Sequence, residues 1–488
     1  MILKPILRQL ADQSRPTAQY KKIHFVGIKG VGMTPLAIIA KEAGIDVSGS
    51  DIASSFITDK PLSRANIIPI TGFAKKNVIG ADLVITTGAH GGFDNVEVKE
   101  AKRLNIDILT QGQAVGIFME GTIFGRKLTG ISVTGTHGKT TTTAMIATIF
   151  KENSLDPSYL VGTGDVVSLR GPGHYGKGEF FIAEADEYAT EPNYDRRPKF
   201  LWQHPKIAVI TNIDFDHPDV YKDLDDVVKA FTKFANTLPK EGVLIICGDS
   251  SETKKLLLQH KGKRITYGFS KNNDFVISNV KFSNGKFSFS LDRNGEKLGE
   301  FNLNVFGQHN ALNATASVIT SLELGLSIAQ IKKSLLEFRG TKRRSEYVGR
   351  LRSGALIFDD YAHHPTEIKK TLTAFKENFK NSKIICIFQP HTYSRTKSLF
   401  EEFGYSFNDA YTVIVTNIYS SLRERIDPTI SAEILKEEIS RSHKDVLFLP
   451  EFKDVIEYID KKSYGRDVII ITMGAGDIYK ISEKLIYE

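Results

Sequence analysis

Short runs of β-branched and other apolar residues alternate along this chain with longer segments of helical periodicity. In its first part, strands are predicted at 23–26, 47–51 and 83–86, and a helix is predicted at 35–43. Alternation of strands with helices is typical of a parallel sheet covered by helices. The pattern therefore predicts an α/β unit in this part of the chain.

A second unit with the same alternation begins near Gly121. Its predicted elements are strands at 131–133, 180–183 and 207–210 and a helix at 139–151. The stretch 274–304 instead alternates polar and apolar residues and carries the pairs Asn284–Gly285 and Asn294–Gly295. Such pairs are typical of two-residue hairpin turns, so antiparallel hairpins are predicted within the second unit.

A third unit begins near Arg339. Its predicted strands lie at 356–358, 384–388, 413–415 and 468–471. At roughly 150 residues per domain, a chain of 488 residues holds about three domains. We therefore predict an α/β protein with domains at 1–119, 120–337 and 338–488, of which the central one has a mixed sheet.

The charge balance changes this picture little. Lys and Arg number 64 against 57 Asp and Glu, the formal net charge is +7, and no block of five or more basic residues occurs. Basic blocks mark nucleic-acid-binding tails, so no nucleic-acid partner is predicted. A mild basic excess suits clefts that bind anionic nucleotides.

The two cysteines, Cys247 and Cys386, lie in apolar, strand-like runs without CxxC spacing. They are expected to be buried thiols, which favours a reducing compartment over a disulfide or a metal site. Residues 1–22 lack the apolar core of a signal peptide, and every apolar run is too short to span a bilayer. These features predict a cytoplasmic protein without a membrane span.

The strongest chemical signal is the segment Thr134 to Thr142, with the sequence Thr-Gly-Thr-His-Gly-Lys-Thr-Thr-Thr. A predicted strand precedes it and a predicted helix follows it, so backbone N–H groups would face phosphate oxygens. Lys139 would neutralise the transferring phosphate, and the Thr140 hydroxyl would bind Mg²⁺. A full Walker A motif needs glycine in place of Val133, so the pattern alone is less specific. The residues expected to bind nucleotide are Gly135, Thr136, His137, Gly138, Lys139, Thr140 and Thr141.

Two polar segments follow strands of the same unit. The first is Glu-Ala-Asp-Glu at 184–187, at the edge where parallel sheets bind ligands, and its carboxylates are good Mg²⁺ ligands. Glu184 is the first candidate there and Glu187 the second. The other segment, 211–217, ends in His217, which would serve a second divalent ion or organise phosphate. Acidic loops and lone histidines are more often structural, so both assignments depend on the neighbouring phosphate loop.

Asn310 lies in the segment 306–314, at the start of a helix predicted at 311–324. Its amide offers both a donor and an acceptor, as the edge of adenine requires. A helix-capping role is the alternative interpretation.

The loop 27–33 of the first unit has Gly-x-x-Gly-x-Gly spacing, which differs from the dinucleotide fingerprint. Its glycines include Gly30 and Gly32, and Asp51 ends the following strand. A nucleotide diphosphate at the helix N-terminus, with Asp51 near a ribose or base, suits this arrangement.

Two segments of the third unit, 359–367 and 389–396, also follow predicted strands. The histidine pair His363–His364 and the downstream Arg395 would hold an amino acid and its carboxylate. Zinc is the competing interpretation of the histidine pair, but no third ligand has convincing spacing in the sequence.

Taken together and in this order, these motifs resemble those of the Mur ligases. They are the phosphate loop, Glu-Ala-Asp-Glu, Asn-x-x-x-Asp-His, His-Asn-x-x-Asn and Asp-Tyr-Ala-His-His-Pro-Thr-Glu, and the resemblance runs from about Lys22 to Tyr479. It implies a UDP-binding Rossmann-like domain, a central P-loop-type ATPase domain and a C-terminal Rossmann-like domain. The loop 27–33 and the segment 389–396 are similar to the L-alanine-adding branch of the family.

The resemblance implies a reaction and a role for each matching residue. L-Alanine would be joined to the carboxylate of UDP-N-acetylmuramate through an acyl phosphate, with ATP and Mg²⁺, in peptidoglycan precursor synthesis by a monomer or weak homodimer. The implied catalytic residues are Lys139, Glu184, His217, His363 and Arg395. Thr140 and Glu184 would bind one Mg²⁺ and His217 a second. The other implied contacts are Asn310 with adenine, Arg344 with the nucleotide phosphates, Asp360 with the ribose, and Gly30, Gly32 and Asp51 with the UDP-sugar.

The sequence departs from the family pattern in three places, and two of them, Thr392 and the segment 194–200, leave the acceptor open. Lys29 stands where the family usually has glycine, and Thr392 stands where many members have arginine, which weakens a carboxylate clamp. The segment 194–200 looks more like the recycling ligase that attaches a preformed tripeptide, L-alanyl-γ-D-glutamyl-meso-diaminopimelate. The tripeptide, glycine and serine therefore remain alternative acceptors.

Two further classes of function compete with a ligase. A catalytically inactive nucleotide-binding partner protein is disfavoured because Lys139, Thr140, Glu184 and His217 are intact. An NAD-dependent oxidoreductase, suggested by the first domain alone, is disfavoured by the second phosphate loop.

Overall fold

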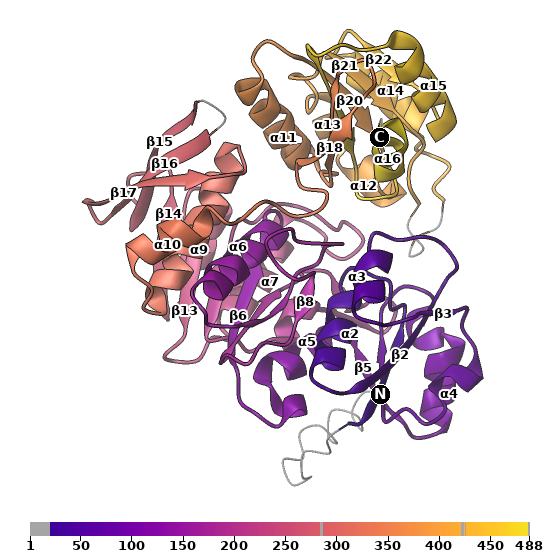
Figure 1. Cartoon of the computed structure of the whole chain (residues 1–488), viewed down its shortest axis with the longest axis vertical. Helices are drawn as coiled ribbons and strands as arrows, with labels where there is room; N and C mark the ends of the chain where they lie inside the picture. The colour runs from indigo at the N-terminus through magenta and orange to yellow at the C-terminus, as the bar shows by residue number, and fades with distance from the viewer. Residues whose placement is uncertain (1–19, 284–285, 421–423, 425, 487–488) are drawn as a thin grey trace.

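The computed structural model describes residues 20–283, 286–420, 424 and 426–486. The chain folds into three consecutive α/β domains. The C-terminal domain lies at one end of the longest dimension of the molecule (Figure 1). The α/β class predicted from the sequence is confirmed, whereas the boundaries at 119 and 337 stay a prediction. The Asn284–Gly285 turn and most of the segment 1–22 lie outside the described residues.

The N-terminal domain is built on a five-stranded parallel sheet in the order β3-β2-β1-β4-β5. Its strands are β1 (Lys22–Val26), β2 (Asp46–Asp51), β3 (Ile70–Thr71), β4 (Leu83–Thr86) and β5 (Asp107–Thr110). Its helices are α2 (Thr34–Glu42), α3 (Asp59–Arg64), α4 (Val96–Arg103) and α5 (Gln111–Glu120), with the short 3-10 turns η1 (Lys75–Val78), η2 (Gly92–Asp94) and η3 (Thr122–Phe124). The apolar strand β1 is buried at the centre, and the loop that follows it carries Gly30 and Gly32 to the carboxyl edge.

The middle domain holds a ten-stranded mixed sheet in the order β17-β16-β15-β14-β13-β12-β6-β9-β7-β8. Its strands are β6 (Thr129–Thr134), β7 (Ser158–Leu160), β8 (Gly173–His174), β9 (Phe180–Glu184), β12 (Ile207–Ile210), β13 (Val243–Cys247), β14 (Lys263–Gly268), β15 (Phe275–Ser283), β16 (Lys286–Arg293) and β17 (Glu296–Leu303). Its helices are α6 (Lys139–Glu152), α7 (Leu224–Ala235), α8 (Ser251–Leu257), α9 (Gln308–Glu323) and α10 (Ile328–Leu335), with η4 (Lys199–Trp202). A separate hairpin pairs β10 (Ala189–Glu191) with β11 (Asp195–Pro198).

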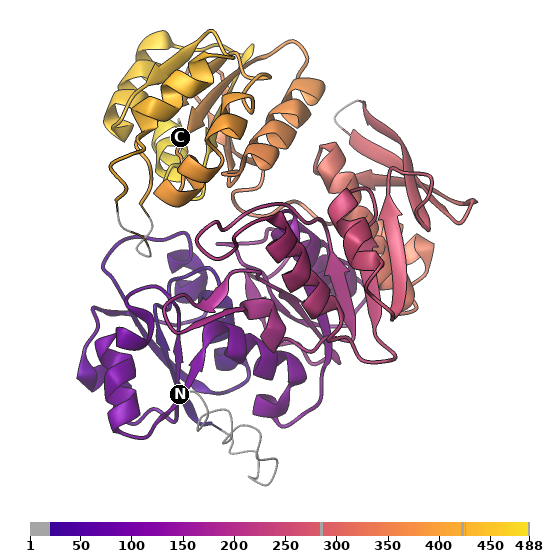
Figure 2. The same ribbon diagram turned by 180° about the vertical axis from the view of Figure 1, so that it is seen from behind.

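The antiparallel part of the middle sheet confirms the hairpins predicted at 274–304. Strands β15, β16 and β17 pair in sequence, and they extend away from the N-terminal domain (Figure 2). In the second turn Asn294 and Gly295 have φ of 48° and 86°. Positive φ at both central residues is the geometry that an Asn-Gly pair favours in a tight hairpin.

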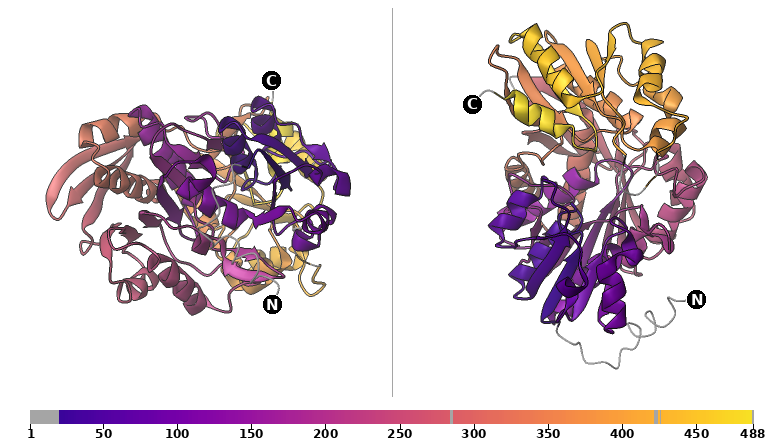
Figure 3. Two further views of the ribbon diagram at one scale, coloured as in Figure 1. Left: turned by 90° about the horizontal axis from the view of Figure 1, so that it is seen from below. Right: turned by 90° about the vertical axis from the view of Figure 1, so that its right-hand side faces the viewer.

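The C-terminal domain holds a six-stranded sheet in the order β18-β19-β23-β20-β21-β22, in which only the edge pair β18–β19 is antiparallel. Its strands are β18 (Glu346–Arg350), β19 (Leu356–Asp360), β20 (Lys383–Phe388), β21 (Thr412–Val415), β22 (Val446–Phe448) and β23 (Val468–Met473). Its helices are α11 (Pro365–Asn378), α12 (Tyr393–Ser398), α13 (Phe400–Gly404), α14 (Ala432–Ser440), α15 (Phe452–Lys462) and α16 (Tyr479–Leu485). The N- and C-terminal domains lie toward opposite ends of the molecule (Figure 3).

Polar contacts join the middle domain to both of its neighbours. On the N-terminal side, His174 Nδ1 lies 2.7 Å from Glu42 Oε2. On the C-terminal side, the loop after β12 contacts the third domain, where Thr366 Oγ1 donates to Asp214 Oδ2 at 2.8 Å. The carboxyl edge of the middle sheet therefore faces the C-terminal domain.

The expectations for the cysteines are confirmed, since Cys247 and Cys386 are both buried and unpaired. Among the residues that the structure describes, no helix is long and apolar enough to cross a bilayer.

Candidate active site

The phosphate loop connects β6 to α6 at the carboxyl edge of the middle sheet. Gly135 and Gly138 have φ of 127° and 85°, which favour glycine. A Cβ at Gly135 would lie 2.1 Å from Thr211 Oγ1, and one at Gly138 would lie 2.6 Å from Asn313 Oδ1. Both glycines are therefore required by the turn that brings the N-terminus of α6 to the sheet edge, where it attracts anions.

The segment after β12 holds the phosphate loop in shape. The His137 N–H donates to Asn212 Oδ1 at 2.9 Å, and the His137 carbonyl accepts from Thr211 Oγ1 at 2.6 Å and Asn212 Nδ2 at 2.8 Å. Thr136 Oγ1 accepts from the Asp214 N–H at 2.9 Å. These bonds fix the loop through protein groups alone, so its conformation is preorganised for phosphate.

Lys139 begins α6 and points back into the loop. Its Nζ donates to the carbonyls of Gly135 at 2.6 Å and Thr136 at 3.2 Å and to Glu187 Oε2 at 2.9 Å. Burial opposes the charge, but Glu187 and Asp186 outweigh it and raise the pKa of Lys139. A mostly buried cation is therefore held inside the phosphate loop, an arrangement suited to stabilise negative charge that develops in phosphoryl transfer.

Glu184 is the last residue of β9 and faces the start of α6. Its Oε2 accepts from Thr140 Oγ1 at 3.2 Å, and its Oε1 accepts from the Gly162 N–H at 2.6 Å. Burial raises the pKa of Glu184, although the Gly162 N–H and the Lys139 charge oppose the shift. A hydroxyl beside a carboxylate supplies the oxygen ligands that Mg²⁺ prefers, and a divalent cation would favour the ionised carboxylate. The pair fits the metal site expected from the sequence.

His217 lies beyond the Lys139 side chain, on the loop after β12. Its Nε2 is 3.9 Å from Glu187 Oε1 and 3.7 Å from Asp216 Oδ2, and its ring packs on Tyr188 with centroids 4.8 Å apart. Glu187 thus lies between Lys139 and His217. A second divalent ion would find an imidazole and a carboxylate here, so Glu187 joins His217 as a candidate ligand.

A cleft between the middle and C-terminal domains gathers most of the residues expected to bind nucleotide. They are His137, Gly138, Thr141, Asn310, Arg344 and Asp360. Val305, Leu312 and Phe338 add apolar wall. Apolar walls with a few placed polar groups are typical of small-molecule sites.

Asn310 lies inside the first turn of α9, which begins at Gln308 and has Gly307 as its N-cap. The helix therefore starts earlier than the sequence predicted, and the capping alternative for Asn310 is wrong. Its Nδ2 donates to the Phe306 carbonyl at 2.8 Å, and its Oδ1 accepts from Asn313 Nδ2 at 3.2 Å. These bonds orient the amide at the cleft wall, while its contact with adenine stays a prediction.

Arg344 and Asp360 reach the cleft from the C-terminal domain. Arg344 Nη2 lies 3.5 Å from Thr140 Oγ1, so the guanidinium extends to the phosphate loop. Asp360 ends β19, and its carboxylate accepts from the N–H groups of Ser345 at 2.6 Å and Ala362 at 2.8 Å. Burial, which outweighs the nearby Arg344 charge, raises the pKa of Asp360 to about 6.

His363 lies in the loop between β19 and α11, and Arg395 lies in α12, which follows β20. His363 Nδ1 is 2.9 Å from the Tyr361 carbonyl, which assigns the proton to Nδ1 and leaves Nε2 as the basic atom. Burial and the Arg395 charge lower the pKa of His363 to about 3. The imidazole is therefore neutral near pH 7, and its Nε2 can accept a hydrogen bond from an amine.

Thr392 is the N-cap of α12 and has a φ of 67°, a strained value for a β-branched residue. Its Oγ1 accepts the Arg395 N–H at 3.4 Å. The hydroxyl at this departure from the family pattern therefore supports the backbone of Arg395 and adds no charge to a carboxylate clamp.

The buried Asp51 carboxylate holds the N-terminal loop, residues 27–33, in shape. This carboxylate is 1% exposed, and its Oδ2 accepts the Lys29 N–H at 2.8 Å. Gln111 Nε2 donates to the Gly32 carbonyl at 3.3 Å, and the Thr34 N–H donates to the Gly30 carbonyl at 2.9 Å. The loop thus forms the start of α2 as expected, while direct contact of Asp51 with a ribose or base stays a prediction.

The Tyr194–Phe200 segment lies in the β10–β11 hairpin and continues into η4. Tyr194 OH donates to Asp94 Oδ2 at 2.8 Å, and the Tyr194 ring packs edge-on against Phe93 with centroids 5.7 Å apart. Both partners belong to the N-terminal domain, whereas His363 and Arg395 belong to the C-terminal domain. The segment therefore forms part of the contact between the middle and N-terminal domains.

Comparisons with known proteins agree with this geometry. The model for "Mur ligase family, catalytic domain" matches residues 22–122, "Mur ligase middle domain" matches 133–321, and "Mur ligase, glutamate ligase domain" matches 343–476. A UDP-N-acetylmuramate–L-alanine ligase of Desulfitobacterium hafniense is 41% identical over 465 residues, which are 95% of this chain and 99% of that protein. This chain belongs to the Mur ligase family.

Solved structures of Mur ligases include relatives from both candidate branches. The UDP-N-acetylmuramate-alanine ligase MurC of Thermotoga maritima is 28% identical, has a TM-score of 0.79, and the match covers 95% of this chain and 98% of that chain. The UDP-N-acetylmuramate:L-alanyl-γ-D-glutamyl-meso-diaminopimelate ligase from Neisseria meningitides is 27% identical, with a TM-score of 0.58, and covers 66% of this chain and 100% of that chain. The similarity to the alanine ligase is therefore the more extensive of the two.

Two carboxylates near the candidate site of this Mur ligase, Asp216 and Glu367, received no role from the sequence motifs. Asp216 binds Arg395, and Glu367 Oε1 lies 3.2 Å from His137 Nδ1. Glu367 could have been placed at the start of α11, because Pro365 at the first helical position and an acidic residue in the first turn are helix-start signals. The contact between Glu367 and His137 could not have been predicted from the sequence, because the two residues lie in different domains.

Proposed function

We propose that this Mur ligase joins L-alanine to the carboxylate of UDP-N-acetylmuramate at the expense of ATP, in peptidoglycan precursor synthesis. The observation that carries the proposal is the match over 95% of the chain to a UDP-N-acetylmuramate–L-alanine ligase at 41% identity. It is supported by a phosphate loop and an acceptor-side His–Arg pair that meet where the middle and C-terminal domains join. A cytoplasmic location follows from substrates that are all intracellular metabolites.

In the first step, a carboxylate oxygen of UDP-N-acetylmuramate attacks the γ-phosphorus of ATP, and ADP leaves. Lys139 is placed to neutralise charge on the transferred phosphoryl group, and the N-terminus of α6 binds its oxygens. Thr140 and Glu184 would hold one Mg²⁺, with His217 and Glu187 beside a second. Bound Mg²⁺ supplies charge stabilisation for phosphoryl transfer.

In the second step, the amine of L-alanine attacks the acyl carbon of the mixed anhydride. A tetrahedral intermediate collapses, the C–O bond to phosphate breaks, and the amide nitrogen loses a proton. The neutral Nε2 of His363 is the group we assign to accept a hydrogen bond from the attacking amine and orient it, and the proton passes to the released phosphate or to water. Arg395 would bind the alanine carboxylate, for which a guanidinium offers parallel hydrogen bonds.

The three domains each contribute one substrate site in this proposal. The N-terminal loop would hold the UDP group, the middle domain the phosphates, and the C-terminal domain the amino acid and part of the nucleotide. Closure of the domains around all three substrates excludes water, which otherwise hydrolyses an acyl phosphate.

The test is a ligation assay with UDP-N-acetylmuramate, ATP and Mg²⁺, in which L-alanine, glycine, L-serine and the tripeptide compete as acceptors. Phosphate release and the mass of the product are measured together. L-Alanine should give the highest kcat/KM, and loss of its methyl group in glycine should lower kcat/KM by about 10- to 200-fold. A higher kcat/KM for the tripeptide would make the recycling ligase the correct assignment.

The same assay separates the other classes of function. An inactive nucleotide-binding partner protein would bind ATP and release no phosphate with any acceptor. Calorimetry on the full chain with UDP-N-acetylmuramate and with NAD tests the oxidoreductase alternative, because only the former should bind.

A further inference from the structure

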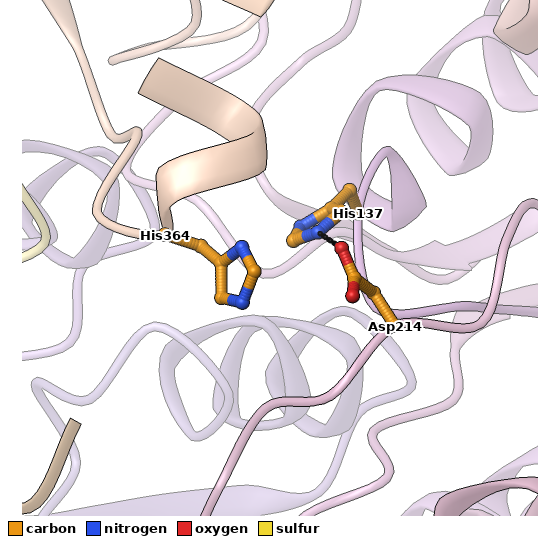
Figure 4. A group of neighbouring side chains, drawn as sticks. All are labelled: His137, Asp214 and His364. Atoms are coloured by element: carbon orange, nitrogen blue, oxygen red, sulfur yellow. Dashed lines mark hydrogen bonds and ion pairs between the residues drawn. The ribbon is translucent and has the colours of Figure 1, made fainter. Parts of the chain in front are cut away.

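A group of metal-ligating side chains lies beside the candidate active site, and none of its members is a metal ligand in the proposed reaction. His137, Asp214 and His364 each offer one ligand atom, and these atoms lie within 4.8 Å of one another (Figure 4). His137 comes from the phosphate loop, Asp214 from the loop after β12, and His364 from the N-cap of α11 in the C-terminal domain. The group therefore spans two domains.

The first two ligand atoms already have the spacing of a metal site. His137 Nε2 lies 3.3 Å from Asp214 Oδ2, and ligands at about 2.0–2.1 Å from a tetrahedral zinc ion lie roughly 3.3 Å apart. The His137 and His364 rings have centroids 4.9 Å apart. The third ligand atom, from His364, lies within 4.8 Å of the other two.

Hydrogen bonds hold both imidazoles in the tautomers that metal binding needs. His137 Nδ1 lies 3.2 Å from Glu367 Oε1, so Nδ1 carries a proton when the ring is neutral and Nε2 is free to bind a cation. His364 Nε2 lies 2.9 Å from the Phe215 carbonyl, which requires a proton on Nε2 and leaves Nδ1 as the ligand atom. A histidine ligand that donates its other N–H to a carboxylate or carbonyl is the usual arrangement in zinc sites.

Binding would replace two existing interactions, of which the first is the contact between His137 Nε2 and Asp214 Oδ2. His364 Nδ1 accepts the Thr366 N–H at 3.2 Å, a long helix-capping bond that the metal would replace. Asp214 Oδ2 also accepts from Thr366 Oγ1 at 2.8 Å, and this bond can remain because a carboxylate oxygen has more than one lone pair. Only His364 of the pair His363–His364 takes part, and the middle domain supplies the other two ligands, His137 and Asp214.

We propose that His137, Asp214 and His364 form a binding site for a transition-metal cation such as Zn²⁺, and that the bound ion inhibits the enzyme. Two imidazoles and one carboxylate suit zinc, whereas Mg²⁺ prefers all-oxygen sites. The ion ties the phosphate loop to the C-terminal domain, so it slows every step in which that domain moves. The site shares no ligand with the Thr140–Glu184 or His217–Glu187 positions.

The binding test uses the full chain, freed of metal with a chelator and kept in excess Mg²⁺ so that oxygen-rich sites are filled. Zn²⁺ is titrated against a chromophoric chelator. Co²⁺ is used as a second probe, because its visible absorption reports a low coordination number. We expect one high-affinity Zn²⁺ per chain. Absence of Zn²⁺ binding under excess Mg²⁺ overturns the proposal.

Two variants locate the ion and one serves as a matched control. His364→Gln keeps a donor for the Phe215 carbonyl, and Asp214→Asn keeps an acceptor for Thr366, so each removes a ligand with little other change. Each should weaken Zn²⁺ binding by more than about tenfold, whereas His204→Gln, at an exposed histidine that pairs with Glu120, should bind as the wild type does. Wild-type affinity in either ligand variant overturns the proposal.

Turnover supplies the second readout. The ratio of ligation rates with and without Zn²⁺ is measured for each protein, so a change in basal rate does not affect the comparison. Wild type should be inhibited, and His364→Gln should need more than about tenfold higher Zn²⁺ for the same fractional inhibition. Equal zinc sensitivity of the two proteins shows that the inhibitory ion binds elsewhere.

Discussion

Asp216 accepts the Nε–H of Arg395 at 2.8 Å and joins the loop after β12 of the middle domain to α12 of the C-terminal domain. Both side chains are buried, at 8% and 4% exposure. Burial opposes both charges, but each partner favours the charge of the other, so the pKa of Asp216 is lowered and that of Arg395 is raised. The ion pair fixes the orientation of the guanidinium proposed to bind the alanine carboxylate.

We expect Arg395→Lys to raise KM for L-alanine by about 10- to 100-fold, the equivalent of one charge-assisted hydrogen bond at roughly 1.5–3 kcal/mol. Lysine keeps the positive charge, but its ammonium group lacks the planar set of N–H donors with which a guanidinium can bind Asp216 and a substrate carboxylate at the same time. KM for ATP should stay near the wild-type value in steady-state kinetics. Asp216→Asn is the control, since it keeps Arg395 and should raise the same KM less. A parallel rise in both KM values would assign Arg395 to the domain contact alone.

Lys139→Ala should lower kcat by at least about 100- to 1,000-fold, because a preorganised charge at the transferred phosphate is lost. The substitution also leaves Glu187 buried without its cation, so some loss of thermal stability is expected. Adding Glu187→Gln should restore the melting temperature without restoring turnover, and exposed Lys240→Ala should change neither. Near-normal turnover of Lys139→Ala would refute the phosphate-binding role.

The phosphate loop could be predicted from the sequence because a strand, a glycine turn and a helix start are local features. The hairpin of β10 and β11 was missed because Asp195 to Pro198 is polar and shows no apolar alternation. Contacts such as Asp216–Arg395 and His137–Glu367 depend on how two domains sit against each other. No local pattern encodes that placement, so the ligand set around His364 was also beyond the sequence.

Glu184→Gln should raise the Mg²⁺ concentration needed for half-maximal turnover, because a neutral amide is a poorer ligand than a carboxylate. Burial raises the pKa of Glu184, so in the wild type the Mg²⁺ requirement should increase as pH falls through that raised pKa. The Gln variant should lack this component of the pH dependence. An unchanged Mg²⁺ titration in Glu184→Gln would move the metal to Glu187.

Asp360 provides a pH test of the ribose contact. Its pKa of about 6 means that the carboxyl is neutral below that pH and ionised above it. An ionised carboxylate accepts hydrogen bonds from ribose hydroxyls more strongly, by roughly 1 kcal/mol. Adenosine, which has no titrating phosphate, should therefore bind the wild type more tightly at pH 7 than at pH 5. Asp360→Asn should bind adenosine with little pH dependence. If the affinity of the wild type for adenosine does not change with pH, the ribose does not contact Asp360.

Tyr194→Phe tests whether the Tyr194–Phe200 segment selects the acceptor. The substitution keeps the ring on Phe93 and removes the hydroxyl that donates to Asp94, a solvent-exposed bond of modest strength. Because these partners lie in the N-terminal domain, we expect at most a small rise in KM for UDP-N-acetylmuramate. The ratio of kcat/KM for L-alanine to that for the tripeptide, measured in competition, should stay at its wild-type value, as it should in the matched control Asp94→Asn. A shift of that ratio in Tyr194→Phe would show that the β10–β11 hairpin contributes to acceptor selection, and it would favour the tripeptide as the substrate.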